Sequence, residues 1–327
     1  MTLLTVEDLT IEFPRPGGRS GGAIRPVRGV TLTVEPGQTL GVVGETGCGK
    51  TLTGLAVLGL LPPAARPRGS IRLDGLELLG APPSQLRAVR GSAIAMVFQN
   101  PATAFDPVRP LRTQFERVIR RHRGGSREQA RARAAKLLAE VELHDTDRVL
   151  SSYPHQLSGG MLQRAMIALA LSCEPRLIIA DESTSALDVT VAQQVRRLLL
   201  RLQHAHGFGV LFITHNLGEA RDLCDRVAVL YAGEVVETGP VEDVFTAPAH
   251  PYTKALLGAV PTVDGDGAPL ASLPGEVPAD VLAVTGCVFA NRCPQAANLC
   301  RSTPPPARSL PGDRRALCHF ADPEVAA

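Results

Sequence analysis

Alternating apolar and polar residues open the chain. The stretch TLLTVEDLTIEF, residues 2–13, has the two-residue period of a strand, and VTLTV, residues 30–34, repeats it after a loop rich in proline, glycine and arginine. Two later runs, RLIIAD at 176–181 and GVLFITH at 209–215, are apolar almost throughout. Such runs are typical of strands buried on both faces of a parallel sheet, so the pattern predicts an α/β fold.

Helical periods separate these strands. The run KTLTGLAVLGLL, residues 50–61, is expected to be a helix that follows directly on a glycine-rich turn. A second helix is expected over residues 126–143, where Ser126 and Gln129 have the spacing of a capping box. Its apolar residues recur on one face: Ala130, Ala134, Leu137 and Val141.

The amino-acid composition of the chain changes near residue 240. RVAVLYAGEVVETG, residues 226–239, resembles a hairpin, but 13 of the 27 prolines then fall between Pro240 and Pro323. A chain of 327 residues is long enough for one large domain and a smaller one. We therefore predict a main domain over residues 1–240 and a small, loop-rich subdomain over 241–327 that is rich in proline and cysteine.

Composition narrows the class of protein. The chain is 44% apolar and 20% charged, as globular proteins are, and its formal charge of +2 does not suggest a nucleic-acid partner. The first ten residues lack the profile of a signal peptide, and the longest apolar run falls far short of the ~20 residues needed to cross a bilayer. A soluble, cytosolic protein is expected.

A phosphate-binding loop is predicted at GETGCGKT, between the run TLGVVG and the first helix. Glycines let backbone N–H groups turn around phosphates, and the N-terminus of the helix favours the same anion. Lys50 is expected to bind the β- and γ-phosphates of ATP, and the Thr51 hydroxyl to bind Mg²⁺. The predicted ATP-binding residues are Gly44, Glu45, Thr46, Gly47, Cys48, Gly49, Lys50, Thr51 and Leu52.

Two acids follow the buried run LIIAD. Asp181, at the end of the predicted strand, is expected to hold Mg²⁺, and Glu182 to orient or deprotonate the attacking water. Beside a phosphate loop, these acids predict hydrolysis rather than a solvated turn.

The segment LSGGMLQR, residues 157–164, resembles the signature of the ATP-binding cassette (ABC) family. MVFQNP places Gln99 at that family's glutamine loop, SALD places Asp188 in its D-loop, and ITHN places His215 at its switch position, with Asn216 where aspartate is common. The resemblance covers residues 1–240.

The resemblance implies a P-loop NTPase fold, with a RecA-like core, an antiparallel β subdomain and an α-helical subdomain at about residues 100–170. It implies catalytic roles for Glu182, His215 and Gln99, with Gln99 also binding Mg²⁺. It further implies that the signature residues bind the ATP of a partner subunit, which makes ATP the link between two cassettes: Ser158, Gly159, Gly160 and Met161.

Adenine stacks on an aromatic residue near the N-terminus in this family. Phe13, at the end of the first predicted strand, is the best candidate. A role confined to core packing stays open for it, because aromatic residues are common in strands.

The segment around HPYT, residues 250–253, resembles the ATPases of dipeptide, oligopeptide and nickel importers. GCVFANRCPQAANLC, followed by ALCHF, resembles their cysteine-rich C-terminal motif, which implies a [4Fe–4S] cluster. Zn²⁺ is the second candidate, and four buried thiols without metal remain an alternative. The expected cluster ligands are Cys287, Cys293, Cys300 and Cys318.

The resemblance implies a peripheral ATPase on the cytoplasmic face of the cell membrane that powers uptake of dipeptides or oligopeptides. Its partners would be a sister ABC ATPase in a heterodimer (or a second copy in a homodimer), two transmembrane permeases and an extracytoplasmic solute-binding protein. Nickel or another small solute is the alternative cargo. A soluble ABC ATPase acting on nucleic acid or ribosomes is less favoured. The interval from Thr51 to Ser158 is too short for the coiled-coil insertion of the DNA-repair class. Members of the ribosomal class usually carry two cassettes, whereas this chain has one.

Overall fold

The computed structural model describes residues 2–15, 23–183, 188–259, 275–278 and 280–321. The chain forms two compact units. The first unit comprises Met1–Leu3, Val34–Gln38 and Gly80–Phe212, and the second comprises Leu4–Thr33, Thr39–Leu79 and Ile213–Ala327. The phosphate loop and the C-terminal segment therefore belong to the same unit.

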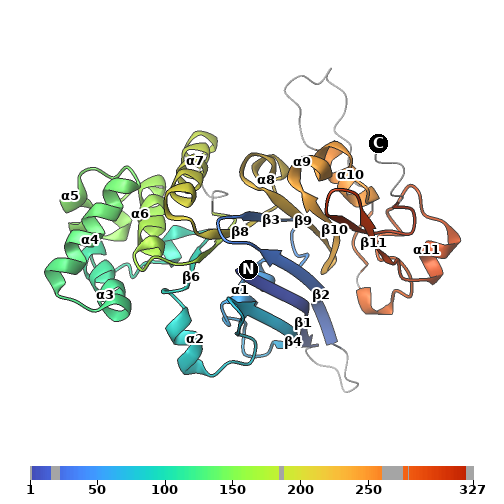
Figure 1. Ribbon diagram of the computed structural model, residues 1–327, viewed down its shortest axis with the longest axis horizontal. Coiled ribbons are helices and arrows are strands. Elements are labelled where there is room, and N and C mark those ends of the chain that lie inside the picture. The colour runs from blue at the N-terminus through green and yellow to red at the C-terminus, as the bar shows by residue number, and fades with distance from the viewer. Residues whose placement is uncertain (1, 16–22, 184–187, 260–274, 279, 322–327) are drawn as a thin grey trace. The chain divides into compact units, whose positions relative to one another are not determined.

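A four-stranded sheet in the second unit begins at the N-terminus, in the order β2-β1-β4-β5 (Figure 1). Its strands are β1 (Leu4–Pro14), β2 (Ala23–Val34), β4 (Arg66–Leu73) and β5 (Leu76–Glu77). Strand β1 pairs antiparallel with β4, and the register shifts between Glu7 and Thr10, where Asp8 has a φ of +47°. The alternation predicted for residues 2–13 is confirmed, since Leu4, Val6, Leu9 and Ile11 are buried.

A further set of strands in this unit has the order β11-β12-β10-β9-β3. Strand β3 (Thr39–Val43) runs parallel to β9 (Arg226–Tyr231), which forms the predicted hairpin with β10 (Glu234–Pro240). Strand β12 (Arg314–Leu317) pairs antiparallel with β10, and β11 (Ala307–Leu310) pairs with β12. The C-terminal segment thus adds two strands to the sheet. Its proline-rich composition did not predict these strands.

Short helices complete the second unit. They are α1 (Lys50–Val57), α8 (Leu217–Leu223), α9 (Val241–Thr246), α10 (Pro251–Gly258), η3 (Val281–Ala283) and α11 (Asn298–Ser302). The prediction that α1 continues to residue 61 is wrong. The helix is capped at Leu58, and Gly59 adopts a left-handed φ of +61° ahead of two prolines.

In the first unit, three strands have the order β8-β7-β6. Strand β6 (Ile94–Val97) runs parallel to β7 (Leu177–Asp181), and β8 (Gly209–Thr214) lies on the other side of β7. Every residue of β7 and β8 is buried, as their continuous apolar runs predict.

Helices form the rest of the first unit, and α3, α4, α5 and α6 lie together in Figure 1. The elements are α2 (Pro83–Val89), η1 (Pro101–Thr103), α3 (Leu111–Arg123), α4 (Arg127–Glu140), α5 (Thr146–Ser151), η2 (Pro154–Gln156), α6 (Gly159–Leu171) and α7 (Val189–His206). The capping box of α4 is present, and its predicted apolar face is buried. Helices α3–α6 fall in the region of about 100–170, and the helical subdomain expected there stays a prediction.

Candidate functional site

Glycines shape the predicted phosphate loop where the chain leaves the buried strand β3. A Cβ added to Gly44 would lie 2.2 Å from the carbonyl oxygen of Leu230, and one added to Gly49 would lie 2.6 Å from that of Pro26. Gly49 has a φ of +103° and caps the N-terminus of α1. Side chains are thus excluded from both ends of the loop by its own surroundings, which leaves its backbone amides as the groups that can bind phosphate.

Lys50 lies at the start of α1 with only 5% of its surface exposed. Its Nζ donates to the carbonyl oxygens of Gly44 at 2.8 Å and Glu45 at 3.0 Å. Burial raises the pKa of the neighbouring Cys48 thiol, which Lys50 partly opposes. Thr46, Gly47 and Thr51 are exposed and Leu52 is half-buried. A buried cation that donates to two carbonyl oxygens and, at 3.9 Å, to Sγ of Cys48 is well suited to an incoming polyphosphate.

Glu45 ties the phosphate loop to distant parts of the chain. Its backbone N–H donates to the hydroxyl of Tyr252 on α10 at 3.0 Å. Its carboxylate accepts two hydrogen bonds from Arg292, both at 2.9 Å. The sequence analysis missed Arg292, because its partner lies 247 positions away along the chain.

An aromatic cluster supports these contacts. Tyr231 packs against Tyr252 with ring centroids 4.6 Å apart, and against Phe289 at 5.1 Å. Tyr252 and Phe289 also meet edge to face at 5.5 Å. All three rings are almost fully buried. The segment that contains Phe289 and Arg292 is therefore packed onto the strand and helix that support the phosphate loop.

The predicted catalytic acid lies in the first unit, directly after β7. Glu182 adopts a φ of +43°, a left-handed conformation that is costly for a side-chain-bearing residue and is concentrated at functional sites. Its Oε2 accepts a hydrogen bond from Nε2 of Gln99 at 3.0 Å. Asp181, beside it, is 7% exposed. The structure thus brings together Glu182 and Gln99, two residues chosen from motifs 83 positions apart.

The predicted signature residues begin α6. Ser158 caps the helix, accepting from the backbone N–H of Met161 at 3.3 Å, and Ser158 and Gly159 are exposed. A Cβ added to Gly160 would lie 2.7 Å from Cγ1 of Val191 on α7. The helix N-terminus is thus open to an anion, while its second glycine is fixed by packing within the same unit.

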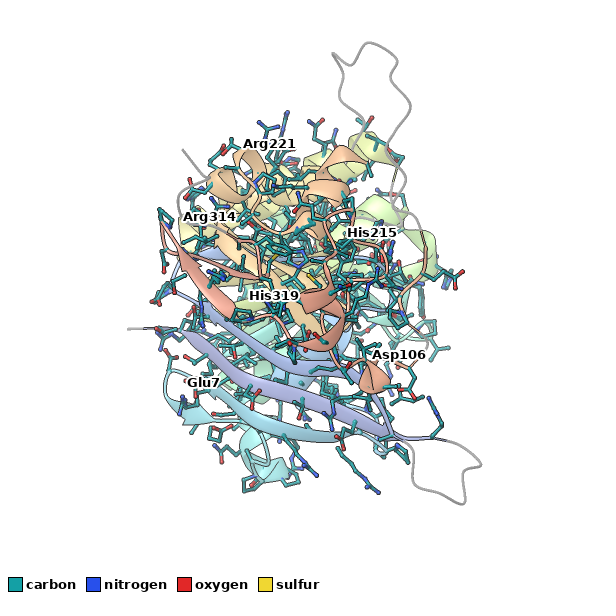
Figure 2. All side chains as sticks on the ribbon, turned by 90° about the vertical axis from the view of Figure 1, so that its right-hand side faces the viewer. Glu7, Asp106, His215, Arg221, Arg314 and His319 are labelled. Carbon is teal, nitrogen blue, oxygen red and sulfur yellow. The ribbon has the colours of Figure 1, made fainter. Side chains whose placement is uncertain are left out.

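Asp188 caps α7, since its carboxylate accepts from the backbone N–H of Val191 at 3.0 Å. The rest of the predicted D-loop, residues 185–187, lies outside the described residues. In the second unit, His215 is exposed just after β8 (Figure 2). Asn216, which stands where aspartate is common in the family, caps α8 by accepting from the backbone N–H groups of Gly218 and Glu219. An amide oxygen serves as a cap as well as a carboxylate does.

Phe13 is half-buried near the end of β1. That exposure suits either a packing role or a ring that contacts a ligand, so its assignment to adenine stays a prediction.

The four C-terminal cysteines are free thiols, with Cys300 and Cys318 buried and Cys287 and Cys293 partly buried. Burial, with smaller contributions from Cys300, Cys318 and Cys293, raises the pKa of Cys287 to about 11. The backbone N–H of Cys287 donates to the carbonyl oxygen of Cys300 at 2.7 Å, and a Cβ on Gly286 would lie 2.3 Å from the same oxygen. In the part of the chain that the structure describes, no three His, Cys, Asp or Glu side chains have the arrangement of a metal site.

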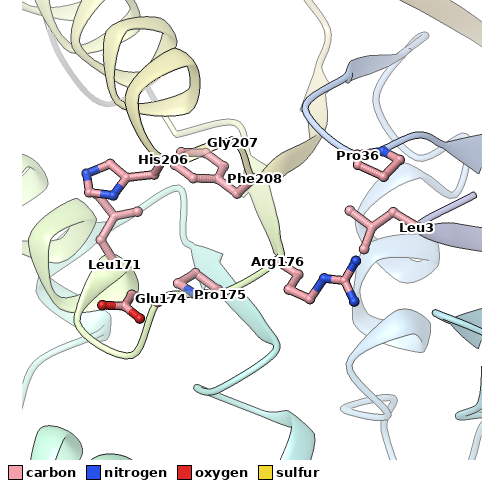
Figure 3. A pocket seen from close by; sticks show the side chains of 9 residues that line it. All are labelled: Leu3, Pro36, Leu171, Glu174, Pro175, Arg176, His206, Gly207 and Phe208. Carbon is pink, nitrogen blue, oxygen red and sulfur yellow. The ribbon is translucent and has the colours of Figure 1, made fainter. Parts of the chain in front are cut away.

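The first unit contains a cavity of about 240 Å³ at the ends of α6 and α7 (Figure 3). It is lined by Leu3, Pro36, Leu171, Glu174, Pro175, Arg176, His206, Gly207 and Phe208. None of the predicted ATP-binding residues lines it. Among the described residues, no helix has the length and apolarity of a membrane span.

Comparison with known families gives two matches. A family model described as "ABC transporter" matches residues 27–185, and one described as "Oligopeptide/dipeptide transporter, C-terminal region" matches residues 236–300. Among solved structures, the dimeric MJ0796 cassette, described as a bacterial ABC transporter cassette, aligns with a TM-score of 0.64 and 27% identity over 73% of this chain and 99% of its own. A form of that cassette bound to ADP and phosphate aligns equally well.

Similar proteins extend along the whole chain. The oligopeptide transport ATP-binding protein OppD of Salmonella typhimurium is 40% identical over 96% of this chain and 92% of its own. The dipeptide transport ATP-binding protein DppD of Escherichia coli is 40% identical over 98% of this chain and 97% of its own. The probable D,D-dipeptide transport ATP-binding protein DdpD of the same organism is 42% identical over 99% and 98%.

Proposed function

This chain belongs to the ABC transporter family of ATP-binding proteins, and on that premise we propose that it powers the uptake of dipeptides or oligopeptides by hydrolysing ATP. The observation that carries the proposal is the C-terminal match over residues 236–300, found together with relatives named for oligopeptide and dipeptide transport along almost the whole chain. Nickel or another small solute is the second candidate cargo.

ATP binding is assigned to the phosphate loop. The backbone amides at Gly44–Thr51 bind the phosphates, and Lys50 exchanges its two carbonyl partners for β- and γ-phosphate oxygens. Phe13 stacks on adenine. Thr51, Asp181 and Gln99 offer hydroxyl, carboxylate and amide oxygens, the hard ligands that suit Mg²⁺. The ion supplies charge neutralisation at the β- and γ-phosphates.

Hydrolysis is assigned to Glu182, the residue with the left-handed backbone. Its carboxylate orients and deprotonates the attacking water, and the hydrogen bond from Gln99 holds it in place. His215 donates to the γ-phosphate. Gln99 precedes the helices α3–α5, which would contact a permease, and it is assigned the coupling of hydrolysis to transport.

Assembly follows from the signature. Ser158, Gly159, Gly160 and Met161 form an open helix N-terminus that binds the γ-phosphate of ATP held by a partner cassette, and Asp188 links the two sites. The partner cassette is a sister ATPase or a second copy of this chain. Two permeases and an extracytoplasmic binding protein complete the importer, which places this subunit at the cytoplasmic face of the membrane.

The cysteine segment is assigned a [4Fe–4S] cluster, with Zn²⁺ as the alternative. Support comes from four free thiols, three of which raise the pKa of the fourth, Cys287, and from the backbone N–H of Phe320, which donates to Sγ of Cys318 at 3.4 Å. Ligation requires the thiols to draw together and lose their protons, because the thiolate is the ligand. A bound cluster would link residues 286–300 to Cys318.

The metal assignment is tested by elemental analysis of protein purified without oxygen. Iron with sulfide, or zinc, is expected at near-stoichiometric levels, lost in Cys300→Ser and kept in Cys173→Ser, which changes a buried thiol of the first unit. Protein free of both metals contradicts the assignment.

Transport is tested in cells that lack this subunit. Uptake of a labelled dipeptide should return with the wild-type chain and with Glu142→Gln, but not with Glu182→Gln. Glu142 is a matched control, because it is also a glutamate of the first unit with a left-handed φ, of +64°. Restored uptake of nickel without uptake of any peptide would select the second cargo, and restored transport by Glu182→Gln would contradict the catalytic assignment.

A further inference from the structure

A carboxylate inside a phosphate loop is electrostatically awkward, because it lies beside the site of a polyanion. Glu45 is such a residue, one position after the first glycine of the loop. We infer that Arg292, in the cysteine-rich segment, is a positioning residue for the phosphate loop: it neutralises Glu45 and holds the loop in the conformation that binds ATP. The inference rests on the proposed ATP binding and assigns the C-terminal segment a part in it.

The contact between the two side chains has the geometry of a strong ion pair. Nη1 of Arg292 donates to Oε2 of Glu45 and Nη2 to Oε1, each at 2.9 Å, so both carboxylate oxygens are bound by one planar group. The Arg292 side chain is 4% exposed and the Glu45 side chain 31%. Arg292 also lies over the Tyr231 ring, 5.7 Å from its centroid. Burial on this scale separates the pair from the weak ion pairs of protein surfaces.

The remaining polar groups of Glu45 are also bound. Its N–H donates to the Tyr252 hydroxyl at 3.0 Å, and its carbonyl oxygen accepts from Nζ of Lys50 at 3.0 Å and from the backbone N–H of Cys48 at 3.4 Å. The conformation of this residue is therefore fixed from three directions. Two of them, Tyr252 and Arg292, come from the C-terminal part of the chain.

The loss of Arg292 would leave the Glu45 carboxylate without its counter-charge. The carboxylate would then repel the triphosphate or compete with it for Lys50, whose Nζ already lies against the backbone oxygen of Glu45. Either effect weakens ATP binding. Neither acts on the water-activating group, because Glu182 and its partner Gln99 belong to the first unit.

The coupling must also run in reverse. If the ion pair favours the loop conformation that binds ATP, bound ATP favours the ion pair by the same factor. Bound ATP should thus hold the segment around Arg292 more firmly, and amide hydrogen exchange across residues 286–293 should slow in the wild-type chain and not in a variant that lacks the pair.

Arg314 provides a matched control in the same unit (Figure 2). It is the other buried arginine of the described C-terminal segment, 4% exposed, and it pairs with the buried Glu237 at 3.1 Å. Its partners, Glu237 and the carbonyl oxygen of Ala247, lie outside the phosphate loop. Arg314 and Arg292 thus share chemistry and burial but differ in whether they touch Glu45.

The test is a double-mutant cycle on the full chain, with the Kd for MgATP and the rate of ATP hydrolysis measured for each variant. Arg292→Gln should raise the Kd and the KM about tenfold, with kcat changed less than about twofold. In a Glu45→Gln background, where there is no charge to neutralise, the same substitution should change the Kd less than about threefold. Arg314→Gln should lower thermal stability and change the Kd less than about twofold.

A wild-type Kd in Arg292→Gln would overturn the inference, and so would an equal loss of affinity in the Glu45→Gln background or in Arg314→Gln. Where Arg292→Gln does not fold, Arg292→Met, which also removes the charge but keeps an apolar stem of similar length, replaces it in the cycle with the same criteria. A wild-type chain that binds no ATP refutes the proposed function instead, so the two failures are distinct.

Discussion

Glu182 and Lys50 are both assigned to ATP, but their surroundings differ. Glu182 is half-exposed, and the hydrogen bond that holds it comes from Gln99, itself exposed. Lys50 is buried, in a loop whose first glycine leaves no room for a Cβ against Leu230. In the first unit Glu182 and Gln99 therefore lie at least partly at the surface, whereas in the second unit the lysine of the predicted phosphate loop is buried.

This difference predicts which substitutions affect function alone and which also affect stability. Ser158 and Asp188 make hydrogen bonds within three residues, Glu182 bonds to the exposed Gln99, and all three lie at least partly at the surface, so substitutions there should alter function in a protein that still folds. The phosphate loop is fixed by residues up to 247 positions away. Substitutions around it should alter stability as well.

The largest effect is expected for Glu182→Gln in the first unit. ATP hydrolysis should fall by roughly 10²–10⁴-fold, the usual contribution of a general base, while ATP binding and thermal stability stay close to wild type. Steady-state kinetics measure the rate of hydrolysis, and a melting curve measures thermal stability. Glu142→Gln should keep its rate, and an unchanged rate in Glu182→Gln would assign the base elsewhere.

Arg314→Gln, in the second unit, should have the opposite effect: it should lower stability and leave hydrolysis unchanged. Removal of one partner of a buried pair, in which Glu237 is fully buried, should cost about 3 kcal/mol in the free energy of unfolding. The rate of hydrolysis per folded molecule should not change. Urea denaturation measures the loss, with the exposed neighbour variant Arg315→Gln as control. Equal stability in both variants would show that the buried ion pair of Arg314 with Glu237 does not stabilise the fold.

A pH effect is expected from His250, which caps α10 through Nδ1 and is 1% exposed. Burial lowers its pKa from 6.5 to about 3. Between about pH 6.5 and 3, His250 is therefore protonated in the unfolded chain but neutral in the folded chain. The free energy of unfolding should fall by about 1.4 kcal/mol for each unit that the pH drops in this range. His250→Asn keeps a capping oxygen without the titration, so its stability should lose that part of the pH dependence. Identical pH profiles for the two proteins would contradict the assignment.

The smallest effect is expected for Tyr252→Phe, which removes only the hydroxyl that accepts from the Glu45 N–H. An unsatisfied amide should cost about 1 kcal/mol of stability and weaken ATP binding by less than about threefold. Tyr153→Phe, at an exposed position, is the matched control. A larger loss of affinity here than in Arg292→Gln would shift the positioning role from the ion pair to the hydroxyl.

Motifs whose meaning is local could be predicted from the sequence. The glycines and lysine before α1, the capping serine of α6 and the apolar run of β7 can each be recognised from a few consecutive residues. The hairpin of β9 and β10 was predicted for the same reason. Gly59 shows the limit of this reasoning, because the apolar run continues through it while the helix stops just before.

Features that depend on distant partners could not be predicted. Strand β12 has four residues, RRAL, and pairs with the distant β10 as well as with β11. The pairing of Arg292 with Glu45 requires a fold that brings the cysteine segment to the phosphate loop. An isolated arginine beside a cysteine carries no local pattern that could reveal its partner.

The contact between Gly160 and Val191 changes how mutants of the signature should be interpreted. An alanine at position 160 would meet Cγ1 of Val191 at 2.7 Å before any nucleotide arrives, and a valine in a helix has few other rotamers. An inactive Gly160→Ala protein is therefore not evidence for a lost contact across subunits. A suppressor screen distinguishes the causes, because Val191→Ala can restore Gly160→Ala only when the defect is steric.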